Sequence, residues 1–340
     1  MNQPSFERII QIGSGYSASK VLLSAVGLGL FTELAAQPMT AAQIAERFGL
    51  VPRPARDFLD ALVSLKLLDR DGDGPEASYA NTAETGHFLD ENSPTYLGGL
   101  LKIWDQRNYR SWADLTEALQ TGQAQSEIKY TGMSFFETMY AEPSRLEAFM
   151  SAMDSSSRVN FELLAQRFPF DRYRTLCDVG GADAVLSRIV ATRHPHLQIT
   201  SWDLPKVTEI AARKIDAEGL SGRVRAQAGS FLTDPLPRAD VITMGMILHD
   251  WDLERKKLLV AKAYAALPEG GSFIVIESLI DDARRENTFG LMMSLNMLIG
   301  FGDAFDYTAA DFQQWCSEAG FRSFEVIPLD GPSSAAVAYK

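Results

Sequence analysis

The sequence predicts an α/β protein with a mostly parallel, doubly wound sheet that closes on an antiparallel strand, preceded by a helical winged-helix module. Three observations favour this class. Strands and helices alternate between residues 176 and 277. An apolar run ends in Asp178 and a glycine turn that opens a helix, as in nucleotide-binding folds. Two short strands, 324–329 and 333–339, are separated by the turn residues 330–332.

The length and charge of the chain indicate how many domains it has and which partners it can bind. The chain has 340 residues, of which 46% are hydrophobic. A single core rarely grows beyond about 250 residues, so we expect more than one domain. The 32 basic residues are outnumbered by 44 acidic ones and do not cluster. This predicts that the protein has no nucleic-acid partner.

Cysteine usage and hydropathy predict the compartment. Cys177 and Cys316 lie far apart and show no metal-ligand spacing, which is typical of reduced core thiols in a cytoplasmic protein. The longest apolar stretch, 21–34, is shorter than the roughly 20 residues that span a bilayer and is interrupted by Glu33. It also lacks the flanks of a signal peptide. We therefore expect no membrane partner and no targeting element.

The first 90 residues form a small helical module. A capping box at 40–43 starts one helix, Gly49 ends it, and apolar residues at helical spacing predict a second helix over 54–68. A turn at 71–74 and a strand at 78–81 complete a helix-turn-helix with a wing. Such a module either binds DNA or serves as a scaffold. Its basic residues are offset by acidic neighbours, which favours the scaffold.

Residues 93–168 keep a helical pattern with apolar faces that do not complete a core by themselves. Such faces must pack against something, so we expect an extensive dimer interface.

Strands are expected at 176–180, 198–203, 224–229, 239–245 and 271–277, and helices at 184–193, 287–299 and 309–319. In such sheets ligands bind at the carboxyl ends of the strands. Asp203 ends the second strand, where a carboxylate can accept the protons of two ribose hydroxyls, or can simply be a solvated acid. His249, one of four histidines, follows the fourth strand and is placed to act as a general base.

Six segments in order resemble one enzyme family. They are Asp178-Val179-Gly180-Gly181, Trp202-Asp203-Leu204-Pro205, Gly229-Ser230-Phe231, Leu248-His249-Asp250-Trp251, Leu267-Pro268-Glu269-Gly270-Gly271 and Ile276-Glu277-Ser278. Over nearly its whole length the chain resembles S-adenosylmethionine-dependent O-methyltransferases of the caffeate and hydroxyindole type, including their bacterial natural-product branch. The resemblance implies a homodimer with a winged-helix dimerisation domain at 1–92, a helical linker and substrate-pocket segment at 93–170, and a Rossmann-like S-adenosylmethionine-binding domain at 171–340.

The resemblance also implies roles for particular residues. His249 would be the base, bracketed by the acids Glu277 and Asp306, although Asp306 can equally be an acid near a helix that Thr308 caps. Trp251 would stack near the adenine, or else fill the core. The implied cofactor-binding residues are Gly180, Gly181, Asp203, Ser230, Phe231, Gly245 and Trp251.

A small-molecule acceptor is expected beside Tyr16, Met150, Met153, Met293 and Asn296. Tyr16 would enter the cleft of the partner subunit, and Asn296 would orient the acceptor. The methionines suit a flat aromatic ligand, although a methionine stripe is also typical of a core. No metal site is predicted.

Four residues depart from the family pattern. Ala182 and Ala184 stand at glycine positions, Ser230 replaces an aspartate, and Gly245 replaces a frequent lysine. An alanine forced to positive φ costs on the order of 1 kcal/mol. Either both alanines adopt ordinary negative φ and the turn survives, or the site has drifted away from methyl transfer.

We therefore expect methyl transfer to a small-molecule hydroxyl, with His249 removing the proton. The alternatives are an S-, N- or C-acceptor, or a related fold repurposed for other chemistry on a secondary metabolite. The closing hairpin and the His-Asp-Trp run disfavour an NAD-dependent dehydrogenase. The sequence does not identify the acceptor.

Overall fold

A computed structural model describes residues 4–133 and 135–340 of the chain. The chain divides into two compact units, Met1–Tyr109 and Arg110–Lys340, each of which has its own apolar core. The predicted class, a large mixed sheet preceded by a helical module, is confirmed.

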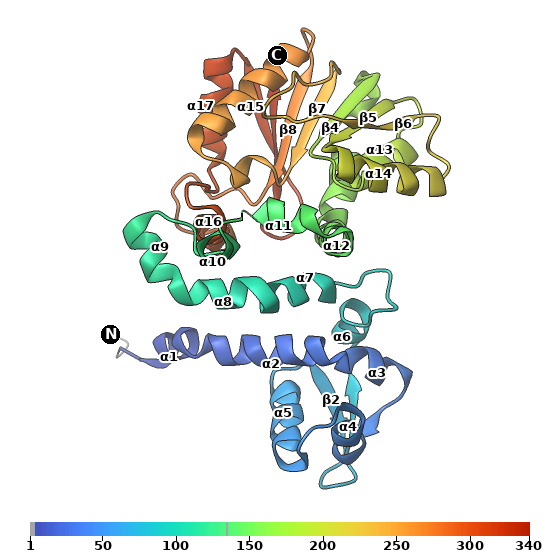
Figure 1. Cartoon of the computed structure of the whole chain (residues 1–340), viewed down its shortest axis with the longest axis vertical. Helices are drawn as coiled ribbons and strands as arrows, with labels where there is room; N and C mark the ends of the chain where they lie inside the picture. The colour runs from blue at the N-terminus through green and yellow to red at the C-terminus, as the bar shows by residue number, and fades with distance from the viewer. Residues whose placement is uncertain (1–3, 134) are drawn as a thin grey trace. The chain divides into compact units, whose positions relative to one another are not determined.

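The amino-terminal unit is helical with a small three-stranded sheet in the order β1-β3-β2 (Figure 1). Its elements are α1 (Glu7–Gly13), α2 (Gly15–Leu28), α3 (Leu30–Ala36), β1 (Met39–Thr40), α4 (Ala41–Phe48), α5 (Pro52–Ser64), β2 (Leu68–Asp71), β3 (Ser78–Asn81), α6 (Ala83–Phe88), α7 (Gly98–Ile103) and a π-helical turn over Trp104–Asn108. The predicted capping box is present, because Thr40 and Gln43 exchange side-chain and backbone hydrogen bonds. The predicted helix 54–68 is wrong at its end: Lys66 takes φ 62°, and Leu68 enters β2 with its side chain buried.

The first two helices expose large apolar side chains. Phe6, Ile9, Ile12 and Tyr16 are exposed to 76%, 72%, 70% and 67%. Among the described residues no single helix is long and apolar enough to cross a membrane. One helix pair bent by 59°, Glu7–Leu28 with Leu30–Ala36, passes that test by length and composition only.

The carboxyl-terminal unit contains a seven-stranded sheet in the order β6-β5-β4-β7-β8-β10-β9. Its strands are β4 (Thr175–Val179), β5 (Gln198–Asp203), β6 (Val224–Ala228), β7 (Val241–Gly245), β8 (Ser272–Glu277), β9 (Ser323–Pro328) and β10 (Ser334–Tyr339). All neighbours are parallel except that β10 runs antiparallel to both β8 and β9. The predicted closing hairpin is therefore confirmed.

Helices cover both faces of this sheet (Figure 1). One face is covered by α12 (Pro143–Arg167), α13 (Val185–Arg193) and α14 (Pro205–Ala217), and the other by α15 (Leu253–Ala266) and α17 (Ala309–Ala319). The other helices from Tyr109 onward are α8 (Tyr109–Ser111), α9 (Leu115–Thr121), α10 (Glu127–Thr131), α11 (Phe135–Ala141) and α16 (Thr288–Phe301), with 3-10 turns at Trp112–Asp114, Phe170–Arg172 and Leu248–Asp250. As predicted, Thr308 caps α17, accepting a hydrogen bond from the Asp311 amide.

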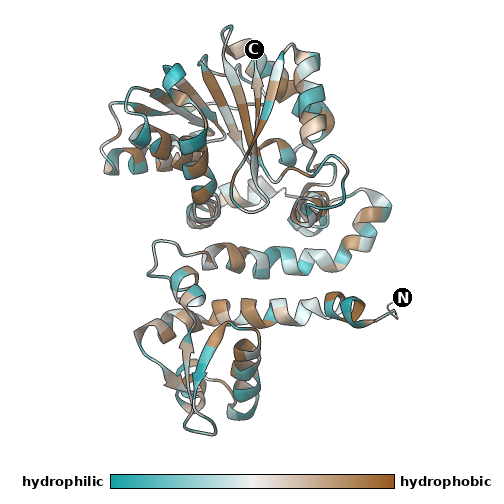
Figure 2. Ribbon diagram, turned by 180° about the vertical axis from the view of Figure 1, so that it is seen from behind, coloured by the Kyte–Doolittle hydropathy of each residue, from teal (hydrophilic) through white to brown (hydrophobic). Residues whose placement is uncertain are grey.

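Alternating residues of each strand supply two separate cores. Leu176 packs with α12 and α13 on one face, while Cys177 and Val179 pack with α15 and α17 on the other. The strands are accordingly hydrophobic along much of their length (Figure 2). Because both faces are covered, only the strand ends are left to form a site.

Candidate active site

The loop after β4 keeps a left-handed conformation in spite of its alanines. Gly180, Ala182 and Ala184 have φ values of 69°, 48° and 67°. Of the two alternatives drawn from the sequence, the one in which both alanines take ordinary negative φ is therefore wrong, and the turn is formed with both alanines at positive φ. The left-handed conformation costs each alanine roughly 1–2 kcal/mol of conformational free energy. Contacts elsewhere in the fold must therefore stabilise the loop in this conformation.

Asp178 fixes the strand below the loop. Its buried carboxylate accepts hydrogen bonds from the hydroxyls of Thr243 at 2.9 Å and Ser187 at 3.0 Å. Burial raises the pKa of Asp178 to about 6, and these two bonds oppose the rise. The carboxylate thus joins β4 to β7 and to α13.

Three glycines at the carboxyl ends of the strands are closely packed by neighbouring side chains. A Cβ atom on Gly180 would lie 2.3 Å from Ile247 Cδ1, and one on Gly181 would lie 2.4 Å from Ser201 Oγ. A Cβ on Gly229 would lie 2.2 Å from Trp202 Cζ2. A larger side chain at any of these positions would therefore have to displace its neighbours.

Asp203 lies beside this loop, as predicted. Its Oδ2 atom accepts the Ala182 amide at 2.9 Å and its Oδ1 atom accepts the Leu204 amide at 2.6 Å. Burial raises the pKa of Asp203 to about 6, although both amide bonds lower it. Each carboxylate oxygen keeps a second lone pair, so both remain able to accept a ribose hydroxyl.

Phe231 and Trp251, both predicted to bind the cofactor, contact each other. Their rings meet edge to face with centroids 5.8 Å apart, and the buried Trp251 Nε1 atom has no hydrogen-bond partner among the described residues. The Ser230 amide donates to Asp234 Oδ2 at 2.9 Å. Sequence reasoning did not single out Asp234, whose carboxylate thereby fixes the backbone at Ser230.

Gly245 ends β7 and lies close to α12. A Cβ atom there would lie 3.2 Å from a ring carbon of Phe161, which packs against this end of the strand. The next residue, Met246, takes φ 55°, and its sulfur accepts the Ser157 hydroxyl at 3.2 Å. A direct role of Gly245 in cofactor binding stays a prediction.

The structure brings the three predicted catalytic residues together. His249 is 6% exposed, and its Nδ1 atom lies 3.2 Å from Asp306 Oδ1 and 3.4 Å from Glu277 Oε2. Glu277 also accepts the Leu248 amide at 3.1 Å. On the other side of the ring, Nε2 lies 3.5 Å from Asp250 Oδ1. Two carboxylates thus orient one nitrogen, as in a base held by acid partners.

Electrostatics favour the charged imidazole. Burial alone would lower the pKa of His249, but the carboxylates of Glu277, Asp306 and Asp250 raise it to about 10. Burial also raises the pKa of Glu277 to about 7, with His249 opposing that rise.

His249, Glu277 and Asp306 offer donor atoms within 4.8 Å of one another, a set that can also hold a metal ion. The expectation of no metal stays a prediction.

Lys256 on α15 is a further charged residue at this site that sequence reasoning missed. Its side chain is fully buried, its ammonium group donates to the Trp251 carbonyl, and it lies 3.7 Å from the centroid of the Phe305 ring. Burial lowers the pKa of Lys256 to about 8, although nearby carboxylates, Glu277 first, oppose this. A lysine at an otherwise apolar helix position was the available signal.

The predicted pocket residues separate into different environments. Met293 and Asn296 are neighbours on α16, and Asn296 Oδ1 accepts the Trp112 indole N–H at 3.1 Å. Met153 is half-buried on α12, whereas Met150 is buried in an apolar cluster with residues of α14. Tyr16 belongs to the amino-terminal unit and is exposed, so its place in a partner's cleft stays a prediction.

Glycines at a strand edge, an acid beside them and a histidine bracketed by carboxylates are the features that the resemblance led us to expect of a methyltransferase. Comparison with known families agrees: an O-methyltransferase domain matches residues 112–322, and an O-methyltransferase dimerisation domain matches residues 10–90. The chain belongs to the O-methyltransferase family. The resemblance found in the sequence, and the enzyme class it implied, are confirmed.

Similar proteins act on different acceptors. The chain is 38% identical to the tetracenomycin polyketide synthesis 8-O-methyl transferase TcmO of Streptomyces glaucescens, covering 98% of this chain and 96% of that protein. It is 37% identical to the N,N-dimethyltransferase OxyT of Streptomyces rimosus, covering 95% and 92%. Human N-acetylserotonin methyltransferase, solved in complex with SAM, superposes with a TM-score of 0.91 at 29% identity, covering 100% and 98%.

Proposed function

We propose that this protein transfers the methyl group of S-adenosylmethionine to a hydroxyl of an aromatic small molecule, with His249 as the general base. The observation that carries this proposal is the His249 imidazole, whose Nδ1 atom faces both Glu277 and Asp306 at the edge of the sheet that holds the glycine loop. A base in this position accepts the acceptor's proton as the new bond forms.

The residues at the strand ends suit S-adenosylmethionine. The glycine backbone leaves room for a close approach, Asp203 can accept ribose hydroxyls, and the buried, unpartnered Trp251 Nε1 atom lies in the same region. Bound there, the cofactor supplies a methyl group already activated by its sulfonium. The protein's own contribution is alignment of the acceptor and removal of its proton.

The direction of proton transfer follows from the hydrogen bonds of His249. With Nδ1–H donated to Asp306, the Nε2 atom is the nitrogen left to take a proton. The carboxylates then stabilise the imidazolium that forms. Asp306 and Glu277 thus act through the histidine as positioning residues.

The acceptor class is inferred from the side chains that we expect to line its pocket and from the relatives of the chain. Met153, Met293 and Trp112 offer thioether and aromatic surfaces, and Asn296 supplies a polar amide. Flat aromatic phenols suit such a surface, and the printed name of TcmO describes O-methylation in polyketide synthesis. An aromatic amine is the second candidate, which the name of OxyT favours.

The exposed apolar face of α1 and α2 supports a homodimer. Large hydrophobic side chains at Phe6, Ile9 and Ile12 are each more than two-thirds exposed, and the family's dimerisation domain matches this unit. A second copy of this chain is the partner that we propose.

We also propose a cytoplasmic enzyme, consistent with the free, buried Cys177 and Cys316, without a nucleic-acid or membrane partner.

Cofactor choice can be tested directly. Quenching of tryptophan fluorescence should report saturable binding of S-adenosylmethionine and S-adenosylhomocysteine but none of NADH. Tight NADH binding without binding of either sulfur compound would refute the proposed function.

The activity should rise with pH. A general base works in its neutral form, and the pKa of His249 is raised to about 10, so kcat/KM should increase with pH and level off near that value. The profile should be recorded with two acceptors whose own hydroxyl pKa values differ. If kcat/KM rises over the same pH range with both acceptors, the titrating group belongs to the enzyme. A rise that shifts with the pKa of the acceptor hydroxyl, or a kcat/KM that does not change with pH, contradicts the assignment of His249 as the base.

Charges on the exposed face of α1 should dissociate the dimer. The double variant Ile9→Asp/Ile12→Asp places two carboxylates on a face proposed to be buried, so light scattering should report the 37.5 kDa monomer. Val51→Asp, a similarly exposed apolar position in the same unit, should leave the dimer intact. A monomeric parent protein would disprove the dimer.

A further inference from the structure

The cofactor loop carries a buried acid that no cofactor role explains. Asp183 lies between Ala182 and Ala184, and its side chain is completely buried. Its Oδ2 atom pairs with the ammonium group of Lys214 on α14, while its Oδ1 atom has no hydrogen-bond partner among the described residues. A buried carboxylate is stable only when it is paired, so this contact is required by the fold.

Lys214 connects the loop to the helix that begins just after Asp203. Two contacts therefore hold the loop from different sides: the Ala182 amide bonds to Asp203 at the end of β5, and Asp183 pairs with α14. Both contacts depend on the left-handed backbone at 182 and 184. Turning either alanine to negative φ would reorient the peptide at Asp183 and swing its carboxylate away from Lys214.

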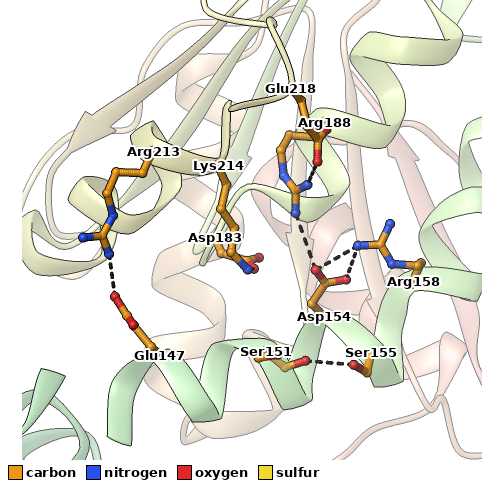
Figure 3. A network of polar contacts seen from close by, with 10 residues as sticks. All are labelled: Glu147, Ser151, Asp154, Ser155, Arg158, Asp183, Arg188, Arg213, Lys214 and Glu218. Atoms are coloured by element: carbon orange, nitrogen blue, oxygen red, sulfur yellow. Dashed lines mark hydrogen bonds and ion pairs between the residues drawn. The ribbon is translucent and has the colours of Figure 1, made fainter. Parts of the chain in front are cut away.

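Neighbouring charges balance this pair (Figure 3). Asp154 of α12 bonds to Arg158 at 2.7 Å and approaches Arg188 at 3.5 Å, and Arg188 also pairs with Glu218. Burial raises the pKa of Asp154, Asp183 adds to the rise, and the cations including Lys214 oppose it. The two acids thus share a set of cations supplied by α12, α13 and α14.

We propose that Asp183 and Lys214 are positioning residues, and that the ion pair between the buried Asp183 carboxylate and the partly exposed Lys214 ammonium holds the cofactor loop in its left-handed conformation, replacing the conformational freedom that glycine would give at 182 and 184. The ion pair offsets the cost of the two alanines. It keeps the Ala182 amide on Asp203, so that the ribose-binding carboxylate and the glycine backbone are correctly placed before the cofactor arrives. This inference rests on the proposed function, since it assumes that the loop binds S-adenosylmethionine.

The test first removes the ion pair between Asp183 and Lys214 and then replaces Ala182 by glycine. In the double variant Asp183→Asn/Lys214→Met no buried charge is left alone. Calorimetry should show S-adenosylhomocysteine binding about tenfold more weakly, since one left-handed alanine costs about that factor. Adding Ala182→Gly should restore most of the affinity, because glycine takes positive φ without penalty. Ala182→Gly alone should change the affinity of the parent little.

Arg213→Met is the matched control. Arg213 adjoins Lys214 on α14 and pairs with Glu147, but both side chains are more than half exposed, at 68% and 52%. This variant should bind the cofactor as the parent does. If the double variant proves unstable in thermal melting, Asp183→Asn alone serves, because the Lys214 side chain is 38% exposed and can turn to water.

The outcomes separate the inference from the proposed function. Unchanged affinity in the folded variant overturns the inference, as does an affinity loss that glycine at 182 fails to recover. A parent protein that binds no S-adenosylhomocysteine overturns the proposed function instead. Acceptor KM, measured at saturating cofactor, should stay near the parent value, because the pair acts on the cofactor loop alone.

Discussion

Replacement of His249 by alanine should reduce kcat/KM for a hydroxyl acceptor by roughly 10² or more, the usual contribution of a general base. The imidazole is buried, and its Nδ1 atom lies against the carboxylates of Asp306 and Glu277, so alanine at this position removes the group that we propose as the base. The cofactor contacts of the glycine loop are formed by other residues, and the affinity for S-adenosylmethionine should persist.

The matched control is His87→Ala, a histidine of the amino-terminal unit. Turnover should be unchanged in this variant. Unchanged turnover in His249→Ala would show that the histidine is not the base and would favour an acceptor that carries no proton to remove. If cofactor affinity falls together with turnover, the substitution has disturbed the strand ends, and the rate alone cannot be assigned to proton transfer.

The second large effect is expected for Glu277→Gln. Glutamine keeps an oxygen for the Leu248 amide but removes the negative charge beside His249. A nearby carboxylate raises a histidine pKa, so its loss should move the rising limb of kcat/KM to lower pH by about 1–3 units. The plateau should fall as well, because the imidazolium formed in the reaction loses a stabilising partner.

The matched control is Glu286→Gln, which makes the same change at an exposed position after β8. This variant should leave the pH at which kcat/KM rises, and its value at high pH, as they are in the parent. If kcat/KM of the Glu277→Gln variant rises at the same pH as in the parent, Glu277 does not set the pKa of His249. The neighbouring acids Asp306 and Asp250 would then carry the effect.

The strand ends could be predicted from the sequence because they are set by short, local patterns. Apolar runs fix where β4, β5, β7 and β8 end, and parallel pairing brings those ends to one edge. Because Glu277 ends β8 and His249 lies in the turn that follows the adjacent β7, their contact is predictable. The Thr308 cap was predictable for the same reason, since a capping box lies within one turn.

The parts that could not be predicted depend on tertiary contacts. The φ values of Ala182 and Ala184 are imposed by contacts from β5 and α14, and local preference alone would have favoured negative φ. The Asp183–Lys214 pair joins residues 31 apart, and nothing at either position marks the other. Lys256 occupies an apolar helix position, but which groups meet its ammonium depends on how α15 packs against the loop that carries Phe305.

The most direct test of the proposed function is a methyl-transfer assay with isotopically labelled S-adenosylmethionine and three acceptors that share one aromatic ring and carry a hydroxyl, an amine or a thioether. We predict that the label appears on the hydroxyl oxygen, with one S-adenosylhomocysteine formed per methyl transferred and a kcat/KM that rises with pH. Label on nitrogen or sulfur alone, or no transfer to any acceptor by protein that binds the cofactor, would contradict it.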